Sequence, residues 1–263
     1  SDWSSDVCSS DLDCIRFVAN DSERVSVGGG SHSGRSMRLI SIALRQAVDA
    51  LLAKGVEQAA SMLQAAPSDV RYSAGSFTSG RASVDLWTLA RAQGKGLESA
   101  GEIFNQTGGF PYGSHVCEVE VDPDTGKVAI VGWTGVDDVG LAINPLVLHG
   151  QAHGSVTQGI GQALCEGVAY EPRTAQLLSA SFMDYALPRA DTLPSFVTRI
   201  MEVPASSHPM GIRPGGEGGT TPALGLVVNA IVHALSGYGV TDVAMPTTSE
   251  RVWQAIQAAK KGG

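Results

Sequence analysis

The chain has 263 residues, of which 43% are hydrophobic and 17% are charged, and its formal net charge is −8 at pH 7. This length suits one large or two small globular domains with a buried core. The acidic balance and the lack of a basic run argue against a nucleic-acid partner, and no apolar stretch reaches the roughly 18 residues of a membrane span. Its cysteines show no metal-binding or disulfide spacing; they are Cys8, Cys14, Cys117 and Cys165.

The first twelve residues differ in character from the rest. Residues 1–12 are rich in Ser and Asp and fit no helix or strand, and they lack the basic start and apolar run of a signal peptide. Their reverse translation matches a short-read sequencing adapter read as codons; the alternative is a flexible polar N-terminus. We interpret residues 1–12 as an adapter artefact and residues 13–263 as the domain, and we expect the gene to be truncated at its 5′ end.

The N-terminal half shows helical and then strand-like periodicity. Apolar spacing predicts a helix from Met37 to about Gln64, with a break at Gly55. A hairpin is expected over 70–78, followed by a helix that Ser83 caps and that ends near Ala92. Cys117 and Cys165 lie in apolar surroundings and are expected to be ordinary core thiols.

The second half alternates between strands and helices. Alternation over 115–121, a turn signal over 122–126 and a return over 127–136 predict a β-hairpin. Further strands are expected over 177–181 and 196–203, and Phe182, Met183 and Tyr185 are expected in the core. The fold class is therefore α+β.

A long helix is expected over Pro145–Cys165 and a buried helix over Thr221–Leu235, and a capping box of Thr247 and Glu250 predicts a final helix. Glycine in a helix interior costs up to about 1 kcal/mol relative to alanine. The first of these helices contains glycines at 150, 154, 159 and 161. We infer that another helix or a ligand packs very closely against it.

Two loops carry candidate functional residues. Residues 211–223 place one carboxylate, Glu217, among glycines and prolines ahead of an apolar helix, where a ligand could approach the backbone. The Ser-rich loop, residues 30–36, precedes a helix and offers backbone N–H groups, hydroxyls and a guanidinium to an anion. Each loop also has a plain interpretation, a solvated turn for the first and a helix cap for the second.

Several polar residues lie around the long glycine-containing helix. The amide of Gln151 offers donors and acceptors. His149 and His153 have a spacing that could bind zinc, but no third ligand is in place, and we expect polar or packing contacts instead. Asp137, Asp138 and Asn144 are expected to order the turn into this helix.

Six motifs in a fixed order give the chain a family resemblance. The chain resembles, from about Asp21 to Ala258, the C-terminal part of the molybdopterin-binding large subunit of the xanthine dehydrogenase, aldehyde oxidase and carbon monoxide dehydrogenase family. The motifs are Gly28–Met37, Asp137–Pro145, Gly150–Ala163, Ser181–Pro188, Gly211–Ala223 and Met245–Trp253. The expected fold is that family's molybdenum-cofactor-binding domain, truncated at its N-terminus.

The resemblance also implies roles for residues. Glu217 corresponds to the catalytic base, which takes the proton of the water-derived hydroxyl that is transferred to the substrate. Gly218 stands where the family more often has Ala, a departure that should loosen the loop without changing the chemistry. No protein ligand to molybdenum is expected, because the pterin dithiolene holds the metal. The implied cofactor-binding residues are Gly30, Ser31, His32, Ser33, Gly34, Arg35, Ser36, Asn144, Gln151 and Gly216.

The resemblance implies a fragment of a molybdenum hydroxylase catalytic subunit that oxidises an aldehyde, an N-heterocycle or a similar small molecule and is inactive as this fragment. The alternatives are a carbon monoxide dehydrogenase-type oxidation and a non-catalytic ligand-binding subunit. The implied cofactor is molybdopterin cytosine dinucleotide. Iron–sulfur clusters and FAD are expected on partner subunits, in a dimer of heteromers. A cytoplasmic location is expected, and a periplasmic one stays open.

Overall fold

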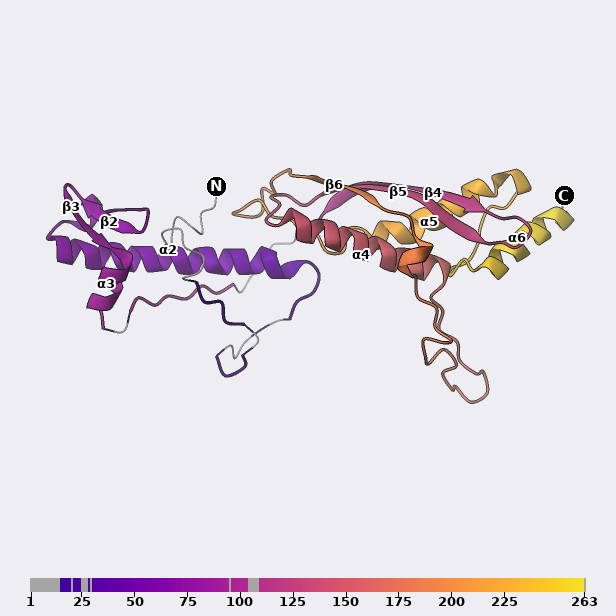
Figure 1. Cartoon of the computed structure of the whole chain (residues 1–263), viewed down its shortest axis with the longest axis horizontal. Helices are drawn as coiled ribbons and strands as arrows, with labels where there is room; N and C mark the ends of the chain where they lie inside the picture. Colours follow the sequence, from indigo (N-terminus) through magenta and orange to yellow (C-terminus); the bar gives the residue numbers. More distant parts are fainter. Residues whose placement is uncertain are drawn as a thin grey trace. The chain divides into compact units, whose positions relative to one another are not determined.

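The computed structural model describes residues 15–19, 21–24, 28, 30–94, 96–103 and 109–262. The chain divides into two compact units, one of Ser1–His32 with Ser36–Gln106 and one of Ser33–Arg35 with Thr107–Gly263. Figure 1 shows the elements of each unit in chain order. The interpretation of residues 1–12 as an artefact falls outside the described residues.

The first unit combines a long helix with a small antiparallel sheet. Helix α2 spans Arg35–Leu63 and α3 spans Leu86–Ala92. The sheet has the strand order β1-β2-β3. Its strands are β1 (Arg71–Ser73), β2 (Ser76–Ser79) and β3 (Ala82–Asp85), with a 3-10 turn η2 (Pro67–Asp69) ahead of them. The expected hairpin is confirmed, since Ala74 and Gly75 form the β1–β2 turn with positive φ angles.

Two expectations for this unit are wrong. Helix α2 continues through Gly55 without a break. The glycine serves packing instead: a Cβ there would collide with the ring of Phe77, which lies directly on the helix backbone. Ser83 does not cap α3 but lies in β3. The cap is Asp85, whose Oδ1 accepts a hydrogen bond from the Thr88 amide at 2.8 Å.

The second unit is a three-stranded sheet with helices on one face. The sheet order is β4-β5-β6, with β4 and β5 antiparallel and β5 and β6 parallel. Helices α4 and α5 lie side by side along one face of the sheet, and α6 follows at the C-terminal end (Figure 1). The strands are β4 (Tyr112–Val121), β5 (Val128–Asp138) and β6 (Val197–Met201). The helices are α4 (Pro145–Leu164), α5 (Thr220–Ala234) and α6 (Ser249–Gly262), with 3-10 turns η3 (Ala190–Thr192) and η4 (Ser236–Tyr238).

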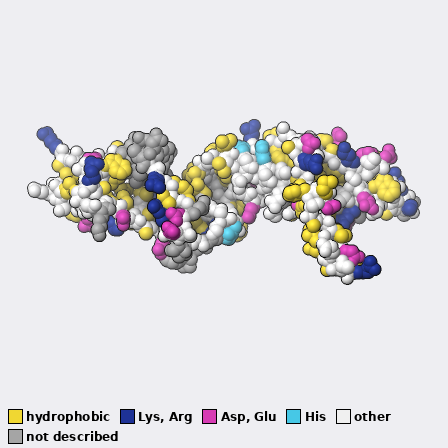
Figure 2. All heavy atoms as spheres, turned by 60° about the horizontal axis from the view of Figure 1, so that its bottom comes forward, with side chains coloured by type: hydrophobic (Ala, Val, Ile, Leu, Met, Phe, Trp, Pro, Cys, Tyr) yellow, Lys and Arg dark blue, Asp and Glu magenta, His cyan; other side chains and the backbone are white. Residues whose placement is uncertain are grey.

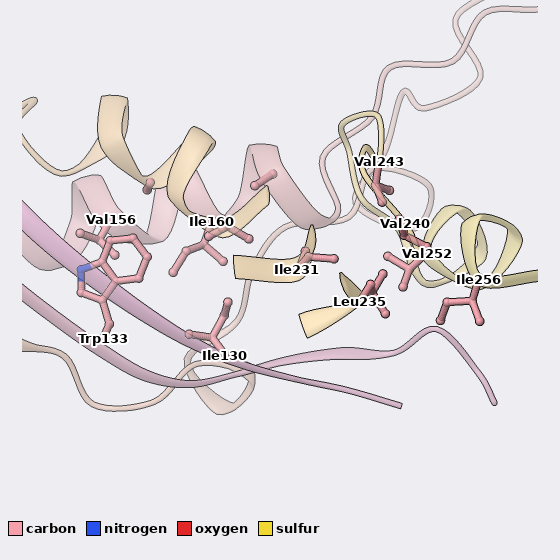
Figure 3. Packing of buried hydrophobic residues seen from close by; sticks show 13 residues of the cluster. Ile130, Trp133, Val156, Ile160, Ile231, Leu235, Val240, Val243, Val252 and Ile256 are labelled. Carbon is pink, nitrogen blue, oxygen red and sulfur yellow. The ribbon is translucent and has the colours of Figure 1, made fainter. Parts of the chain in front are cut away.

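Strand alternation places the core of this unit between the sheet and the helices. In β4 every second side chain faces the helices and its neighbours face outward, as the sequence pattern predicted. Trp133 and Ile130 of β5 meet Val156 and Ile160 of α4, and Ile231 continues the cluster on α5 (Figure 3). Burial of these aliphatic side chains holds α4 and α5 on the sheet.

The two thiols differ in their relation to the core. Both are partly buried, and Cys117 packs against the core cluster, as expected, whereas Cys165 is not among the described residues of that cluster. Burial raises the pKa of Cys117 to about 11, and burial also raises the pKa of Cys165. Both thiols therefore stay protonated at neutral pH.

The glycines of α4 fall into two groups. A Cβ at Gly159 would lie 2.5 Å from Cβ of Ala223 and 2.7 Å from the carbonyl oxygen of Thr220, so this glycine allows α4 to contact the start of α5. In contrast, Gly150 and Gly154 have no atom within 4 Å of an added Cβ. The close packing inferred from the sequence is confirmed at Gly159 and is absent, among the described residues, at Gly150 and Gly154.

Thr247 does not cap the last helix. It is buried, and its hydroxyl donates to the carbonyl of Ala163 at the end of α4, 2.7 Å away. The cap is Thr248, whose hydroxyl accepts from the Arg251 amide at 3.4 Å. The expected capping box is therefore wrong by one position, because the buried carbonyl takes the Thr247 hydroxyl.

The segment between α4 and β6 also differs from expectation. Residues 177–181 form only an isolated bridge, between Tyr170 and Leu177, within an excursion that extends away from the helices (Figure 1). Phe182 and Met183 are 83% and 92% exposed, so they are not core residues. Hydrophobic side chains cover much of this excursion (Figure 2). Tyr185 instead donates its hydroxyl to Glu166 at 2.7 Å.

None of the helices among the described residues combines the length and the apolar character that crossing a membrane requires.

A pair of matched substitutions tests the helix contact. Gly159→Ala should lower the free energy of unfolding by about 1–3 kcal/mol, because the added methyl group overpacks the α4–α5 contact. Gly154→Ala adds the same methyl group to the same helix in open space and should raise the free energy of unfolding by up to about 1 kcal/mol. Urea unfolding of both variants measures this difference. Equal shifts in the two variants would contradict the assigned packing.

Candidate functional site

The loop that carries Glu217 is anchored beside the end of β5. The amide of Arg213 donates to the carbonyl of Val139 at 2.8 Å, and the carbonyl of Gly211 accepts from the Leu141 amide at 3.0 Å. After the loop, the Thr220 amide donates to the carbonyl of Glu217 at 3.2 Å and starts α5. The backbone on both sides of the carboxylate is therefore fixed by hydrogen bonds.

The glycines next to Glu217 let its backbone approach two polar side chains. A Cβ at Gly216 would lie 3.2 Å from Nε2 of Gln151, and a Cβ at Gly218 would lie 3.3 Å from Oδ1 of Asp137. A Cβ at Gly219 would collide with Ser155 of α4. Two side chains therefore lie beside the neighbours of Glu217: Gln151 of α4 beside Gly216, and Asp137 of β5 beside Gly218.

Glu217 itself is exposed. Within the described part of the chain, no hydrogen bond or ion pair engages its carboxylate. A carboxylate with this exposure, on a loop whose backbone is fixed, can accept a proton from a ligand placed against it.

Asp138 fixes the start of the same loop. Its Oδ1 accepts from the amides of Gly140 and Val203, at 2.9 and 3.1 Å. Its Oδ2 lies 3.4 Å from Nε of Arg213, and both side chains are largely buried. The guanidinium also lies over the ring of Tyr112, with its central carbon 4.4 Å from the ring centre. This confirms that Asp138 orders the chain after β5.

The Ser-rich loop reaches the Glu217 loop through Gly34. Gly34 has φ +61° and contacts Pro214 so closely that an added Cβ would collide with that ring. Ser33 is also left-handed, with φ 52°. Ser33–Arg35 therefore belong to the second unit, whereas Gly30, Ser31, His32 and Ser36 belong to the first, where the hydroxyls of Ser31 and Ser36 lie 2.5 Å apart.

The polar residues of α4 have the contacts expected from the sequence. Oδ1 of Asn144 accepts from the Val147 amide at 3.2 Å and caps the helix. His149 and His153 both contact the hydroxyl of Thr198, at 2.7 and 3.2 Å. Among the described residues no group of three or more His, Cys, Asp or Glu side chains could hold a metal. Gln151 is exposed between these histidines.

Sequence reasoning missed one residue of this region, His115. Its Nε2 lies 3.0 Å from Oδ1 of Asp137, and its Nδ1 lies 3.3 Å from Nε1 of Trp133. The sequence showed His115 only as one inward position of an alternating strand. The strand register reveals more, because His115 pairs with Gly135, midway between Trp133 and Asp137.

Known proteins resemble this chain in sequence and in fold. Residues 5–194 match the family model described as molybdopterin cofactor-binding domain. The 6-hydroxypseudooxynicotine dehydrogenase complex subunit gamma of Paenarthrobacter nicotinovorans is 34% identical, over 94% of this chain and 32% of its own length. The carbon monoxide dehydrogenase large chain of Hydrogenophaga pseudoflava is 28% identical, over 92% of this chain and 32% of its own length.

A solved structure shares the fold. Quinoline 2-oxidoreductase from Pseudomonas putida 86 superimposes with a TM-score of 0.77 at 27% identity, over 88% of this chain and 31% of that one. The chain spans about a third of the length of the curated relatives named above. Because the family model covers most of the sequence, this chain belongs to the molybdopterin cofactor-binding domain family, as its motifs predicted.

Proposed function

We propose that this chain forms part of the active site of a molybdenum hydroxylase, in which Glu217 is the general base. One observation carries the proposal: an exposed carboxylate lies between two glycines, and a side chain at the first of these would crowd the Gln151 amide. A general base must lie within about 3 Å of the proton that it removes. Glycines on both sides of Glu217 keep side chains from blocking that approach.

The residues near Glu217 fit the pterin part of the cofactor. Gln151 presents an exposed amide whose donors and acceptors match the polar edge of a pterin. Because Gly216 has no side chain, a flat ring can approach this amide beside the loop. When bound, the molybdenum cofactor supplies the two-electron redox chemistry.

The Ser-rich loop fits the anionic part of the same cofactor. Gly30, Ser31, His32, Ser33, Gly34, Arg35 and Ser36 combine hydroxyls, left-handed backbone and one guanidinium at the start of α2. Within the second unit, Gly34 packs closely against Pro214 of the Glu217 loop. Asn144 is assigned to the nucleotide part, in addition to its role as helix cap.

Residues of this chain are proposed to bind the cofactor and to move a proton. Gln151 and the Ser-rich loop hold and orient the cofactor. Glu217 would accept the proton of the water-derived hydroxyl, and the cofactor, when bound, would supply the two-electron oxidation in which the C–H bond of the substrate is replaced by a bond to this oxygen. The carboxylate then holds this proton beside Gly216 and Gly218 until water or the product removes it.

The substrate class proposed is an N-heterocycle or an aldehyde. The named relatives support an N-heterocycle, since their names refer to pseudooxynicotine and quinoline. Oxidation of carbon monoxide is the second candidate, supported by the likeness to the carbon monoxide dehydrogenase large chain. Assays of the full-length enzyme with quinoline, an aldehyde and carbon monoxide separate the candidates. A full-length protein without molybdenum would instead support a non-catalytic binding subunit.

The relatives named as a complex subunit gamma and as a large chain are parts of multi-subunit enzymes. We therefore propose that this protein works with an iron–sulfur subunit and an FAD subunit in a dimer of heteromers. Its cofactor is proposed to be molybdopterin cytosine dinucleotide. A cytoplasmic location stays a prediction.

Substitution of the base gives a direct test. In the full-length enzyme, Glu217→Gln should lower turnover by roughly 10²- to 10⁴-fold, because an amide cannot accept the proton. Molybdenum content should match that of the wild type, since Gln keeps the size of the side chain. Glu118→Gln, on the outward side of β4, is the matched control and should leave turnover unchanged. Wild-type turnover of a molybdenum-loaded Glu217→Gln variant would remove Glu217 from the mechanism.

A second pair of variants tests the cofactor contact. Gln151→Met keeps the length of the side chain and removes its hydrogen bonds, which should weaken cofactor binding by about 1 kcal/mol, roughly fivefold. Gln158→Met makes the same change at another exposed position of α4 and should have no effect. Molybdenum retained after gel filtration in dilute buffer measures the difference. Equal retention by both variants would exclude Gln151 from the cofactor site.

A further inference from the structure

A buried histidine and aspartate lie directly behind the Glu217 loop. The side chains of His115 and Asp137 are 2% and 12% exposed, and Nε2 of the histidine lies 3.0 Å from Oδ1 of the aspartate. No step of the proposed function uses either residue. Their burial on the inward face of β4 and β5, next to the loop, calls for another role.

The direction of this hydrogen bond follows from Trp133. The indole Nε1–H can only donate, and the atom that faces it, 3.3 Å away, is Nδ1 of His115. Nδ1 is therefore the acceptor, and the proton of the neutral imidazole is on Nε2. Nε2–H consequently donates to Asp137, and the indole and the imidazole form a chain that ends at this carboxylate.

Two glycines provide the space for this arrangement. A Cβ at Gly135, the residue opposite His115, would lie 2.7 Å from Nδ1 of the imidazole. A Cβ at Gly113, the residue opposite Asp137, would collide with Oδ1 of the carboxylate. The imidazole and the carboxylate thus each lie across a glycine of the neighbouring strand, and larger residues there would displace them.

The held carboxylate lies beside the residue that follows Glu217, so that a side chain at this position would crowd it. The position of a Cβ at Gly218 is 3.3 Å from Oδ1 of Asp137, the same oxygen that accepts from His115. On the other side of Glu217, Gly216 meets Gln151. A side chain therefore lies beside each neighbour of Glu217: Asp137, held by His115, beside Gly218, and the exposed Gln151 beside Gly216.

We propose that His115 and Asp137 are positioning residues for the carboxylate of Glu217. This inference rests on the proposed function of Glu217 as the base. His115 fixes the side-chain rotamer of Asp137, and Asp137 fixes the backbone at Gly218, which glycine would otherwise leave mobile. Misplacement of a reacting group by about 1 Å can cost roughly 100-fold in rate, so a fixed backbone here matters for turnover.

Four variants of the full-length enzyme in its complex test the proposal. His115→Phe and His115→Asn both remove the Nε2 donor, one with a ring of similar size and one with a smaller polar group. His115→Gln places an amide N–H near the position of Nε2 and should restore the bond to Asp137. His153→Phe is the matched control, since His153 also bonds a neighbour, Thr198, and contacts an aromatic ring, Phe196.

The Phe and Asn variants should lose roughly 10- to 100-fold in kcat at unchanged KM and molybdenum content. Amide hydrogen exchange in peptides covering residues 213–220 should be faster in these two variants. His115→Gln should stay within about threefold of the wild type in kcat and should restore the slow exchange. His153→Phe should match the wild type in both measurements. If His115→Phe does not fold, the proposal is tested by the difference in kcat and in amide exchange between His115→Asn and His115→Gln.

Wild-type kcat in the Phe and Asn variants would overturn the proposal. So would a Gln variant as slow as the Asn variant, or a loss of kcat that follows a loss of molybdenum. Glu217→Gln is measured in parallel to keep the two proposals apart. If that variant turns over normally, the proposed function fails, whereas the exchange rates still show whether His115 holds the loop.

Discussion

Close approach of the loop backbone at residues 215–219 to α4 and β5 determines where Glu217 lies. At Gly215 and Gly219 an added Cβ would collide with Leu148 and Ser155 of α4. At Gly159 the same helix contacts the first turn of α5. The glycines therefore let this backbone lie against about two turns of α4, between Leu148 and Ser155, while the one larger side chain among residues 215–219, that of Glu217, is exposed.

The hydrophobic core holds α4 and α5 together beneath the Glu217 loop. Val156 and Ile160 of α4 belong to the same buried cluster as Ala223, Val227 and Ile231 of α5. Since these side chains are fully or almost fully buried, α4 and α5 cannot separate without exposing apolar surface. The geometry around Glu217 thus depends on a helix pair whose spacing is fixed by Gly159 on one side and by the core on the other.

Sequence patterns predicted the elements of this unit better than its polar contacts. The β4–β5 hairpin followed from alternation and from the Asp-Pro-Asp-Thr-Gly turn, because both signals are local. Thr247 was misassigned because its partner, the carbonyl of Ala163, is far away in sequence. Phe182 and Met183 were misassigned because apolar character alone does not show whether a segment meets a core. Gly159 was identified because a glycine in a helix interior is unfavourable without close packing.

Within the candidate site, too, residues with a local sequence signal were predicted, whereas contacts between residues far apart in sequence were not. Glu217 and the Ser-rich loop stood out as glycine-rich sequence, and Gln151 was singled out through its match to a family motif. The relation of His115 to Trp133 and Asp137 depends on strand register, which a single sequence does not specify when one strand contains a bulge. Their placement could be read only from the paired strands.

The end of β5 explains how the Glu217 carboxylate, the proposed base, can be exposed while the backbone around it is held. Asp137 and Asp138 are consecutive strand residues, so their side chains point to opposite faces of the sheet. Asp138 holds Arg213, four positions before Glu217, through a buried ion pair. Asp137 lies beside Gly218, one position after it, where an added side chain would crowd its carboxylate. Two adjacent residues of one strand therefore act on both ends of the loop, and neither takes up the carboxylate itself. A base held through its own carboxylate would have to give up that bond to accept a proton, whereas one held through its backbone does not.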